Sequence, residues 1–347
     1  MKKLAILAIT ICGLFSPALA QQKTTLTNPL LPSGPDPYSY YKDGYYYYIH
    51  TEGDKLVLRK TRNFADLATA EKKTIFVPPP GKPWSKELWA PEVIFLRGKW
   101  YAYVAADNGK NINHRMYVLE NASPDPMKGE WVFKGKIADK TDKWAIDGDV
   151  FEYKGKLYMV WSGWEGDTNG QQDIYIARMK DPLTIESDRV RISYPLYDWE
   201  KHGDISNPDD PPHINVNEGP QALMHADDLF VVFSGSACWT DFYALGLLRL
   251  KKGADPLDAG AWQKSSEPVF KQSPENGVYA PGHNSFFQSP DGKEYWILYH
   301  ANSNSGDGCG PKRSPRAQPF TWRADGTPDF GVPVKEGKPI PVPSGAK

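Results

Sequence analysis

Short apolar and aromatic stretches alternate with polar turns along nearly the whole chain, and no stretch of useful length keeps a helical period. The stretches are rich in Tyr, Trp, Val and Ile, which are frequent in β-strands, and the turns carry Gly or Asp. In two neighbouring parts of the chain the pattern predicts strands over residues 93–95, 100–105 and 116–120, and over 150–153, 156–161 and 173–177. The alternation therefore predicts an all-β fold.

One phrase recurs five times: a leading residue, a short apolar strand, a turn and an aromatic-rich strand. The turns fall at Gly44, Gly98, Gly155, Asp227–Asp228 and Asp291–Gly292, and the leading residues are Asp36, Ala90, Asp147, Glu218 and His283. Short strands that recur at a long interval are typical of β-propellers and other repeated β architectures. Because Pro and Gly are spread along the chain and no linker is visible, we expect one domain over residues 21–347.

The N-terminus has the composition of a secretory signal peptide. Met1-Lys2-Lys3 precedes an apolar run over residues 4–15, and Ala18-Leu19-Ala20 follows it. A charged start, a short apolar run and an A-x-A site are typical of a signal peptide over residues 1–20, although a buried first helix is the alternative. We expect cleavage near Ala20 and a secreted or periplasmic protein. No other apolar run has the length that a membrane span requires.

Composition narrows the class of partner. Lys and Arg number 41 and Asp and Glu 42, so no excess of positive charge points to nucleic acid or to an anionic membrane. Aromatic residues make up 13% of the chain. In a secreted protein this favours a carbohydrate ligand, because flat sugar faces stack on aromatic rings, although most rings are expected in the core. We expect the protein to be a monomer.

Two cysteines, Cys238 and Cys309, remain after the predicted signal peptide. An even pair in an oxidising compartment is often bridged, and this bond would join the fourth and fifth repeats. Closing a loop of this length would contribute about 4 kcal/mol to stability in the chain-entropy model. Two free buried thiols are the alternative.

Three of the five leading residues carry a carboxylate: Asp36, Asp147 and Glu218. In a propeller, one position of each innermost strand faces the same end of the central channel, so these side chains would converge. Converging carboxylates repel when ionised, and at least one then keeps its proton near neutral pH. An ionised base opposite a protonated acid is what glycoside hydrolysis requires. Each residue alone could merely shape a turn, but together they favour the catalytic interpretation.

Motifs along essentially the whole chain resemble those of glycoside hydrolase family 43. They are Gly34-Pro-Asp36-Pro-Tyr38, Leu88-Trp-Ala-Pro-Glu92, Ala145-Ile-Asp147-Gly-Asp149-Val-Phe151, Asn217-Glu218-Gly-Pro220 and Gly282-His283-Asn-Ser. The resemblance implies a five-bladed β-propeller that hydrolyses glycosides with inversion at the anomeric carbon. It implies Asp36 as general base, Glu218 as general acid and Asp147 as the carboxylate that raises the pKa of the acid. Asp149 competes with Asp147, and the motif favours Asp147.

The same resemblance implies residues that contact the sugar. The candidates are Trp89 and Ala90 in the Trp-Ala-Pro motif, Trp164, His283, Arg313 and Arg316. Arg313 aligns best with an arginine that the family brings to a sugar hydroxyl, and Arg316 is second. The resemblance also implies that His283 helps to hold a cation, commonly a structural calcium ion, on the axis through water. A site without metal is the alternative, because the sequence has no cluster of ligands with metal-binding spacing. The chemistry itself requires no cofactor.

Stretches over residues 114–120, 236–246 and 309–320 are similar to secreted α-L-arabinofuranosidases. They imply arabinose release from plant cell-wall arabinan or arabinose-containing oligosaccharides, with exo action on α-1,5-arabinan preferred and endo action open. The irregular stretch over residues 194–217 is expected to form a wall of the site, or else a surface insertion. A β-xylosidase or bifunctional enzyme of the same fold is one alternative function. A non-catalytic sugar-binding propeller is an alternative of another class.

Overall fold

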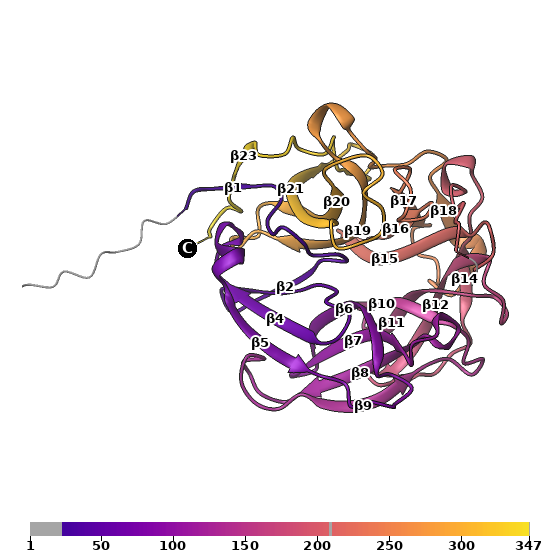
Figure 1. The fold of residues 1–347 in the computed structure, drawn as a ribbon. Helices are drawn as coiled ribbons and strands as arrows, with labels where there is room; N and C mark the ends of the chain where they lie inside the picture. Colours follow the sequence, from indigo (N-terminus) through magenta and orange to yellow (C-terminus); the bar gives the residue numbers. More distant parts are fainter. Residues whose placement is uncertain (1–22, 208–209, 347) are drawn as a thin grey trace, which may run out of the picture.

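The computed structural model describes residues 23–207 and 210–346, and the predicted signal peptide lies outside them. The described chain forms 23 β-strands, β1 to β23, and five short 3₁₀ helices, which confirms the predicted all-β class. Most strands follow one another as antiparallel meanders, arranged as in Figure 1. No helix of the described residues is long and apolar enough to cross a membrane.

Five consecutive units each pair their strands largely in chain order. The first contains β2 (Tyr38–Lys42), β3 (Tyr45–Ile49), β4 (Leu56–Thr61) and β5 (Glu71–Phe76). The second contains β6 (Lys86–Leu96), β7 (Lys99–Asp107), β8 (Arg115–Asn121) and β9 (Val132–Ile137). The third contains β10 (Ala145–Tyr153), β11 (Lys156–Gly163) and β12 (Gln171–Asp181), with β13 (Thr184–Ile185) and β14 (Val190–Ser193) both paired to β12.

The remaining strands complete the fold. The fourth unit contains β15 (Asn215–His225), β16 (Asp228–Gly235), β17 (Ala244–Leu250) and β18 (Trp262–Lys264). The fifth contains β19 (Tyr279–Gln288), β20 (Tyr295–Asn302), β21 (Ser314–Trp322) and β22 (Pro328–Asp329). A short parallel pairing of β12 with β15 joins the third and fourth units into one sheet. β1 (Thr25–Thr27) pairs with β23 (Pro339–Pro341), which brings the two ends of the described chain together.

The five 3₁₀ helices lie in connections between strands. Their bounds are Phe64–Thr69, Asn111–Asn113, Asp198–Glu200, Ala259–Ala261 and Pro274–Asn276. Tight hairpins join the first two strands of the first three units, and both turn residues have positive φ, for example 52° at Asp43 and 81° at Gly44. This geometry matches the right-handed twist of the flanking strands, which explains the recurrence of glycine at these turns.

The first strands of successive units lie against one another. β2 contacts β6, β6 contacts β10, β10 contacts β15, β15 contacts β19, and β19 contacts β2. The apolar core lies between neighbouring units in the same order: Tyr47 packs with Trp100 between the first and second, and Tyr46 with Trp296 between the first and fifth. The starts of the five first strands are therefore held close together by packing.

Candidate active site

Four of the five first strands contain a β-bulge where the predicted site residues lie. The register shifts run from Trp89 to Glu92 in β6, Ile146 to Asp149 in β10, Glu218 to Gln221 in β15 and Gly282 to Ser285 in β19. The first bulge residue is left-handed each time, with φ of 44° at Ala90, 58° at Asp147, 55° at Gly219 and 48° at His283, and Asp36 before β2 has φ of 54°. Non-glycine residues rarely adopt this conformation and are enriched at functional sites, as bulges are.

Glu218 does not occupy the position equivalent to Asp147, so the alignment of the repeats was wrong by one residue in the fourth unit. Strand pairing makes Gly219 the equivalent of Asp147, as the first residue of the bulge. Glu218 is the equivalent of Ile146, the residue before the bulge. The hairpin of this unit closes over Ala226 and Asp227, because His225 pairs with Asp228. Without a glycine in that turn, the sequence gives no clear marker for its register.

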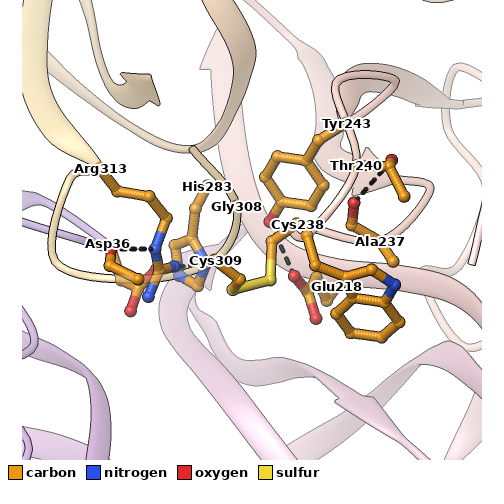
Figure 2. The surroundings of a disulfide bond; sticks show 12 residues. Asp36, Glu218, Ala237, Cys238, Thr240, Tyr243, His283, Gly308, Cys309 and Arg313 are labelled. Carbon is orange, nitrogen blue, oxygen red and sulfur yellow. Dashed lines mark hydrogen bonds and ion pairs between the residues drawn. A yellow bond between two sulfur atoms is a disulfide. The ribbon is translucent and has the colours of Figure 1, made fainter. Parts of the chain in front are cut away.

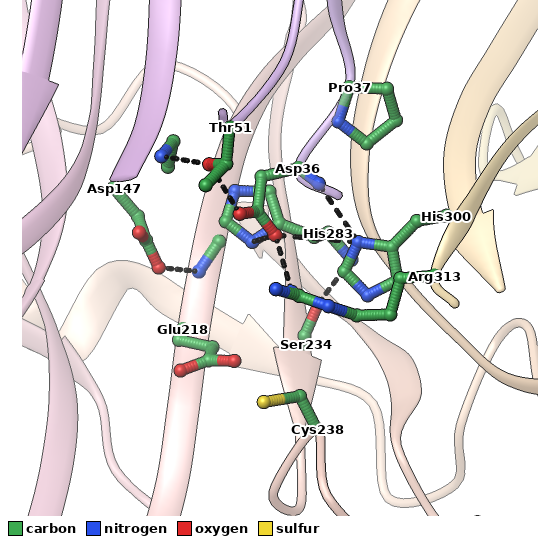
Figure 3. A network of polar contacts seen from close by, with 12 residues as sticks. Asp36, Pro37, Thr51, Asp147, Glu218, Ser234, Cys238, His283, His300 and Arg313 are labelled. Carbon is green, nitrogen blue, oxygen red and sulfur yellow. Dashed lines mark hydrogen bonds and ion pairs between the residues drawn. The ribbon is translucent and has the colours of Figure 1, made fainter. Parts of the chain in front are cut away.

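The side chains of Asp147 and Glu218 still line the same cavity, because the bulges turn successive residues towards the same side of their strands. The Gly219 N–H donates a hydrogen bond to Asp147 Oδ2 at 2.9 Å, which ties β15 to β10 next to Glu218 (Figure 3). Both Ile146 and Asp147 line one cavity, together with Glu218.

This cavity has a volume of about 370 Å³ and lies over the starts of the first strands. The predicted residues that line it are Asp36, Trp89, Asp147, Glu218, Cys238, His283, Cys309 and Arg313. Two further aromatic rings, Trp144 and Trp239, line it without having been predicted. Ile205, Asp210 and Ile214 also line it, so described residues of the irregular stretch do form a wall, as expected.

Asp36 is surrounded by donors and by positive charge (Figure 3). Arg313 Nη1 donates to its Oδ1 at 2.8 Å, Thr51 Oγ1 donates to its Oδ2 at 2.7 Å, and His283 Nδ1 lies 3.3 Å from Oδ1. Burial raises the pKa of Asp36, but Arg313, His283 and His300 together outweigh it and hold that pKa well below its usual range. Asp36 is therefore ionised at neutral pH.

Two neighbours of Asp36 were missed by sequence reasoning. The Asp36 N–H donates to His300 Nδ1 at 3.1 Å, and burial lowers the pKa of His300 to about 3, so this imidazole is neutral. Thr51 Oγ1 also accepts the Ala90 N–H at 2.7 Å. Neither residue belongs to the repeated phrase, so only their positions at the ends of aromatic strands could have suggested them.

Glu218 and Asp147 lie in an environment that favours their protonated forms. Burial raises the pKa of Asp147 well above its usual value, and repulsion from Glu218 and from Asp36 raises it further. Burial also raises the pKa of Glu218 to about 7, with Asp36 adding to the rise, while the Tyr243 hydroxyl and Arg313 oppose it. Burial, rather than Asp147, is therefore the main cause of the raised pKa of Glu218. Glu218 can hold a proton at neutral pH.

Three residues expected to contact a sugar do not line the cavity. Trp164 stacks at 4.6 Å on Trp144, the ring that does line it. Arg316 is fully buried, where it donates to Glu336 and Ser303 at 2.9 Å each. Ala90 is 2% exposed and contributes its backbone N–H to Thr51.

Asp149, the alternative to Asp147, follows it by two residues in β10 and is the first paired residue after the bulge. Its Oδ2 accepts the Ala222 N–H at 2.8 Å, and its side chain hydrogen-bonds Glu92, which also contacts Gln221. Asp149 lines a separate hollow that it shares with Tyr38 and Gln221. This position supports Asp147 as the carboxylate of the candidate active site.

Cys238 and Cys309 form a disulfide bond, as predicted, and both line the cavity (Figure 2). The bond joins the segment over residues 236–243, between β16 and β17, to the segment over residues 303–313, before β21. The first segment carries Trp239 and ends at Tyr243, and the second ends at Arg313. The bond therefore connects the segments whose side chains contact Glu218 and Asp36.

The side chains around His283 do not fit a directly bound calcium ion. The imidazole faces the Asp36 carboxylate, which is already paired with Arg313, and the guanidinium adds positive charge beside it. In residues 23–207 and 210–346, no group of three or more His, Cys, Asp or Glu side chains could hold a metal ion.

Comparison with known proteins places these features in a family. The model of the family "Glycosyl hydrolases family 43" matches residues 26–328 of this chain. The extracellular exo-alpha-(1->5)-L-arabinofuranosidase of Streptomyces avermitilis is 38% identical over 96% of this chain and 69% of that protein. A protein of the same name from Streptomyces chartreusis is 35% identical over 79% of this chain and 81% of its own. The crystal structure of an alpha-L-arabinofuranosidase from Lactobacillus brevis has a TM-score of 0.82 and 36% identity, over 90% of this chain and 98% of that one.

Proposed function

Because the chain belongs to glycoside hydrolase family 43, we propose that it releases L-arabinose from α-L-arabinofuranosyl groups of plant cell-wall arabinan or arabino-oligosaccharides. The relatives named arabinofuranosidases support this substrate class. The observation that carries the proposal is the unequal surroundings of two buried carboxyl groups on one cavity: Asp36 is paired with Arg313, whereas Glu218 contacts the Tyr243 hydroxyl. This pairing lowers the pKa of Asp36, and burial raises that of Glu218 to about 7.

In the proposed reaction, Asp36 is the general base and Glu218 the general acid of an inverting hydrolysis. Asp36 accepts a proton from a water molecule, whose oxygen forms a bond to the anomeric carbon. The bond from that carbon to the leaving oxygen breaks, and the Glu218 proton passes to this oxygen. Because its own pKa is raised, Asp147 keeps its proton and adds no negative charge beside Glu218. No cofactor takes part in these steps.

Exo action on α-1,5-arabinan is the preferred mode within this proposal. The names of the two Streptomyces relatives support it. The wall formed by Ile205, Asp210 and Ile214 is compatible with a cavity that receives a chain end. Trp89, Trp144 and Trp239 supply apolar faces on which a furanose ring can stack.

We further propose that the five units form a single-domain, five-bladed β-propeller, present as a monomer. The cyclic order of contacts among the first strands supports this arrangement, as does the apolar packing between the fifth and first units. Removal of residues 1–20 as a signal peptide, and a secreted or periplasmic location, are part of the same proposal.

Products released from linear arabinan, debranched arabinan and arabinoxylan test the function, with the anomeric configuration followed by NMR. Arabinose alone, formed first as the β-anomer, is the expected product. Arabino-oligosaccharides alone would contradict exo action, and the α-anomer would contradict inversion. Faster turnover of nitrophenyl xylopyranoside than of nitrophenyl arabinofuranoside would favour a β-xylosidase. Sugar binding without turnover would favour a non-catalytic propeller.

A further inference from the structure

The ring of Tyr243 lies next to Glu218, in space that a side chain of the fifth unit would otherwise fill. Gly282 in β19 stands before its bulge, at the position where β15 carries Glu218 and β6 carries Trp89. A Cβ atom on Gly282 would lie 2.1 Å from the Tyr243 ring. The missing side chain of the fifth unit therefore creates the space that the Tyr243 ring fills.

Packing fixes the orientation of this ring. Tyr243 is 1% exposed, and its ring is parallel to that of His300 at 5.7 Å between centroids. The ring also packs with Cys238 and Ala280, so the disulfide-bonded segment holds it from the other side. A side chain enclosed in this way has little rotamer freedom and presents its hydroxyl in one direction.

The hydroxyl of Tyr243 points at the acid. It donates to Glu218 Oε1 at 2.9 Å (Figure 2). Ser234 opposes the rise in the pKa of Tyr243 that burial causes, and Ser234 Oγ accepts the His283 N–H at 2.8 Å. Because a backbone N–H can only donate, Ser234 Oγ is the acceptor of the bond from His283, and the Tyr243 hydroxyl is the donor to Glu218.

We propose that Tyr243 is a positioning residue for Glu218: its hydroxyl donates to Oε1 and leaves Oε2 to carry the proton towards the leaving oxygen. The proposal rests on the proposed role of Glu218 as acid. A protonated carboxyl group without such a donor could carry its proton on either oxygen, and only one of the two protonated forms would be productive. Tyr243 itself needs no proton transfer and touches no substrate.

The charges that face this hydroxyl are known for each neighbouring element. Glu218 comes from β15 and Asp147 from β10, Asp36 precedes β2, the Arg313 guanidinium precedes β21, and neutral His300 lies on β20. The hydrogen bond from Tyr243 opposes the rise in the pKa of Glu218, whereas Asp36 adds to that rise. Removal of the Tyr243 hydroxyl should therefore raise the pKa of Glu218 and leave that of Asp36 almost unchanged.

The test is Tyr243→Phe, which keeps the ring that fills the space at Gly282. We expect the alkaline limb of kcat/KM to move to higher pH while the acid limb stays in place. At the optimum, kcat should fall about tenfold on an arabino-oligosaccharide and less than about threefold on a nitrophenyl glycoside, whose leaving group needs little protonation. Tyr103→Phe is the matched control, because its hydroxyl is also buried and bonded, at 2.8 Å to the Pro182 carbonyl.

A second measurement separates this inference from the proposed function. NMR titration of ¹³C-labelled glutamate, assigned with Glu218→Gln, reports the pKa of Glu218 without substrate. A higher pKa in Tyr243→Phe supports the inference even if no arabinofuranoside is hydrolysed, an outcome that would contradict the function alone. An unchanged pKa and an unchanged alkaline limb in an active enzyme would overturn the inference.

Discussion

Asp36 and Glu218 line the same cavity but differ in the charges that surround them. Asp36 accepts hydrogen bonds from Arg313 and Thr51 and lies beside His283, whereas Glu218 has the neutral Tyr243 hydroxyl as its nearest donor. Burial raises the pKa of both carboxyl groups, yet only Asp36 has an arginine in direct contact. The difference teaches that a direct cationic partner, more than depth of burial, decides which carboxyl group keeps its proton here.

Removal of either carboxylate should have the largest effect. Asp36→Asn and Glu218→Gln should each lower kcat/KM on arabino-oligosaccharides by roughly 10²- to 10⁴-fold, the usual contribution of a general base or acid. On a substrate with a good leaving group, Glu218→Gln should recover much of its activity and Asp36→Asn should not. Glu130→Gln, an exposed position, serves as control. Equal losses of both variants on both substrates would remove the assigned difference in role.

Arg313→Gln tests the cation that distinguishes the two sides. Its guanidinium lowers the pKa of Asp36 and also that of Glu218, so its removal should raise both and move both limbs of the pH profile to higher pH. We expect kcat/KM near pH 5 to fall by about 10- to 100-fold, the size of a charge-assisted hydrogen bond. Arg323→Gln, whose partner Asp329 lies at the surface, should leave the profile unchanged. A profile that keeps its acid limb would refute the role of Arg313.

The pH profile of the unaltered enzyme measures the difference between the pKa values of Asp36 and Glu218. As pH rises through the pKa of Glu218, about 7, the acid loses its proton, and kcat/KM should then fall about tenfold per pH unit. As pH falls, activity should persist below the usual range of an aspartate, because the pKa of Asp36 is lowered. Rates in overlapping buffers at constant ionic strength give both limbs. An acid limb at or above pH 5 would show that Asp36 is not the base.

Loss of the disulfide should have the smallest effect on chemistry and a clear effect on stability. The bond closes a separation of 71 residues, so Cys238→Ala with Cys309→Ala should lower the free energy of unfolding by about 4 kcal/mol in the chain-entropy model. Urea unfolding measures this, with the reduced unaltered protein as comparison. Activity well below the unfolding transition should fall only a few-fold, since Arg313 and Tyr243 keep their other contacts. A much larger loss would mean that the bond itself positions both carboxyl groups.

The sequence predicted the part of the site that follows the repeat. Asp36, Asp147 and His283 could be found because each precedes a recognisable turn by a similar number of residues. Glu218 was found through its motif, although its register was one residue out, since Ala226 and Asp227 form a turn without glycine. The all-β class followed from alternation alone, because backbone pairing of short aromatic strands leaves few other outcomes.

The rest of the site depends on contacts between units, which no local pattern encodes. Thr51, Tyr243 and His300 reach the carboxylates from other strands or connections, so only the folded chain brings them there. Trp144 and Trp164 form one stacked pair, and sequence could not tell which ring faces the cavity. The same holds for Arg313 and Arg316, which lie near one another in the chain but point into different surroundings.

The repeated bulge has a consequence for how such an enzyme can diversify. At each of the four bulges the left-handed residue, the one before it, or both line the cavity: Trp89, Ile146 with Asp147, Glu218, and His283. Substitutions at these few positions can therefore change specificity or chemistry while the inherited scaffold is conserved. Four copies of one bulge, with left-handed Asp36 before the remaining first strand, give evolution and protein engineers five positions for new side chains.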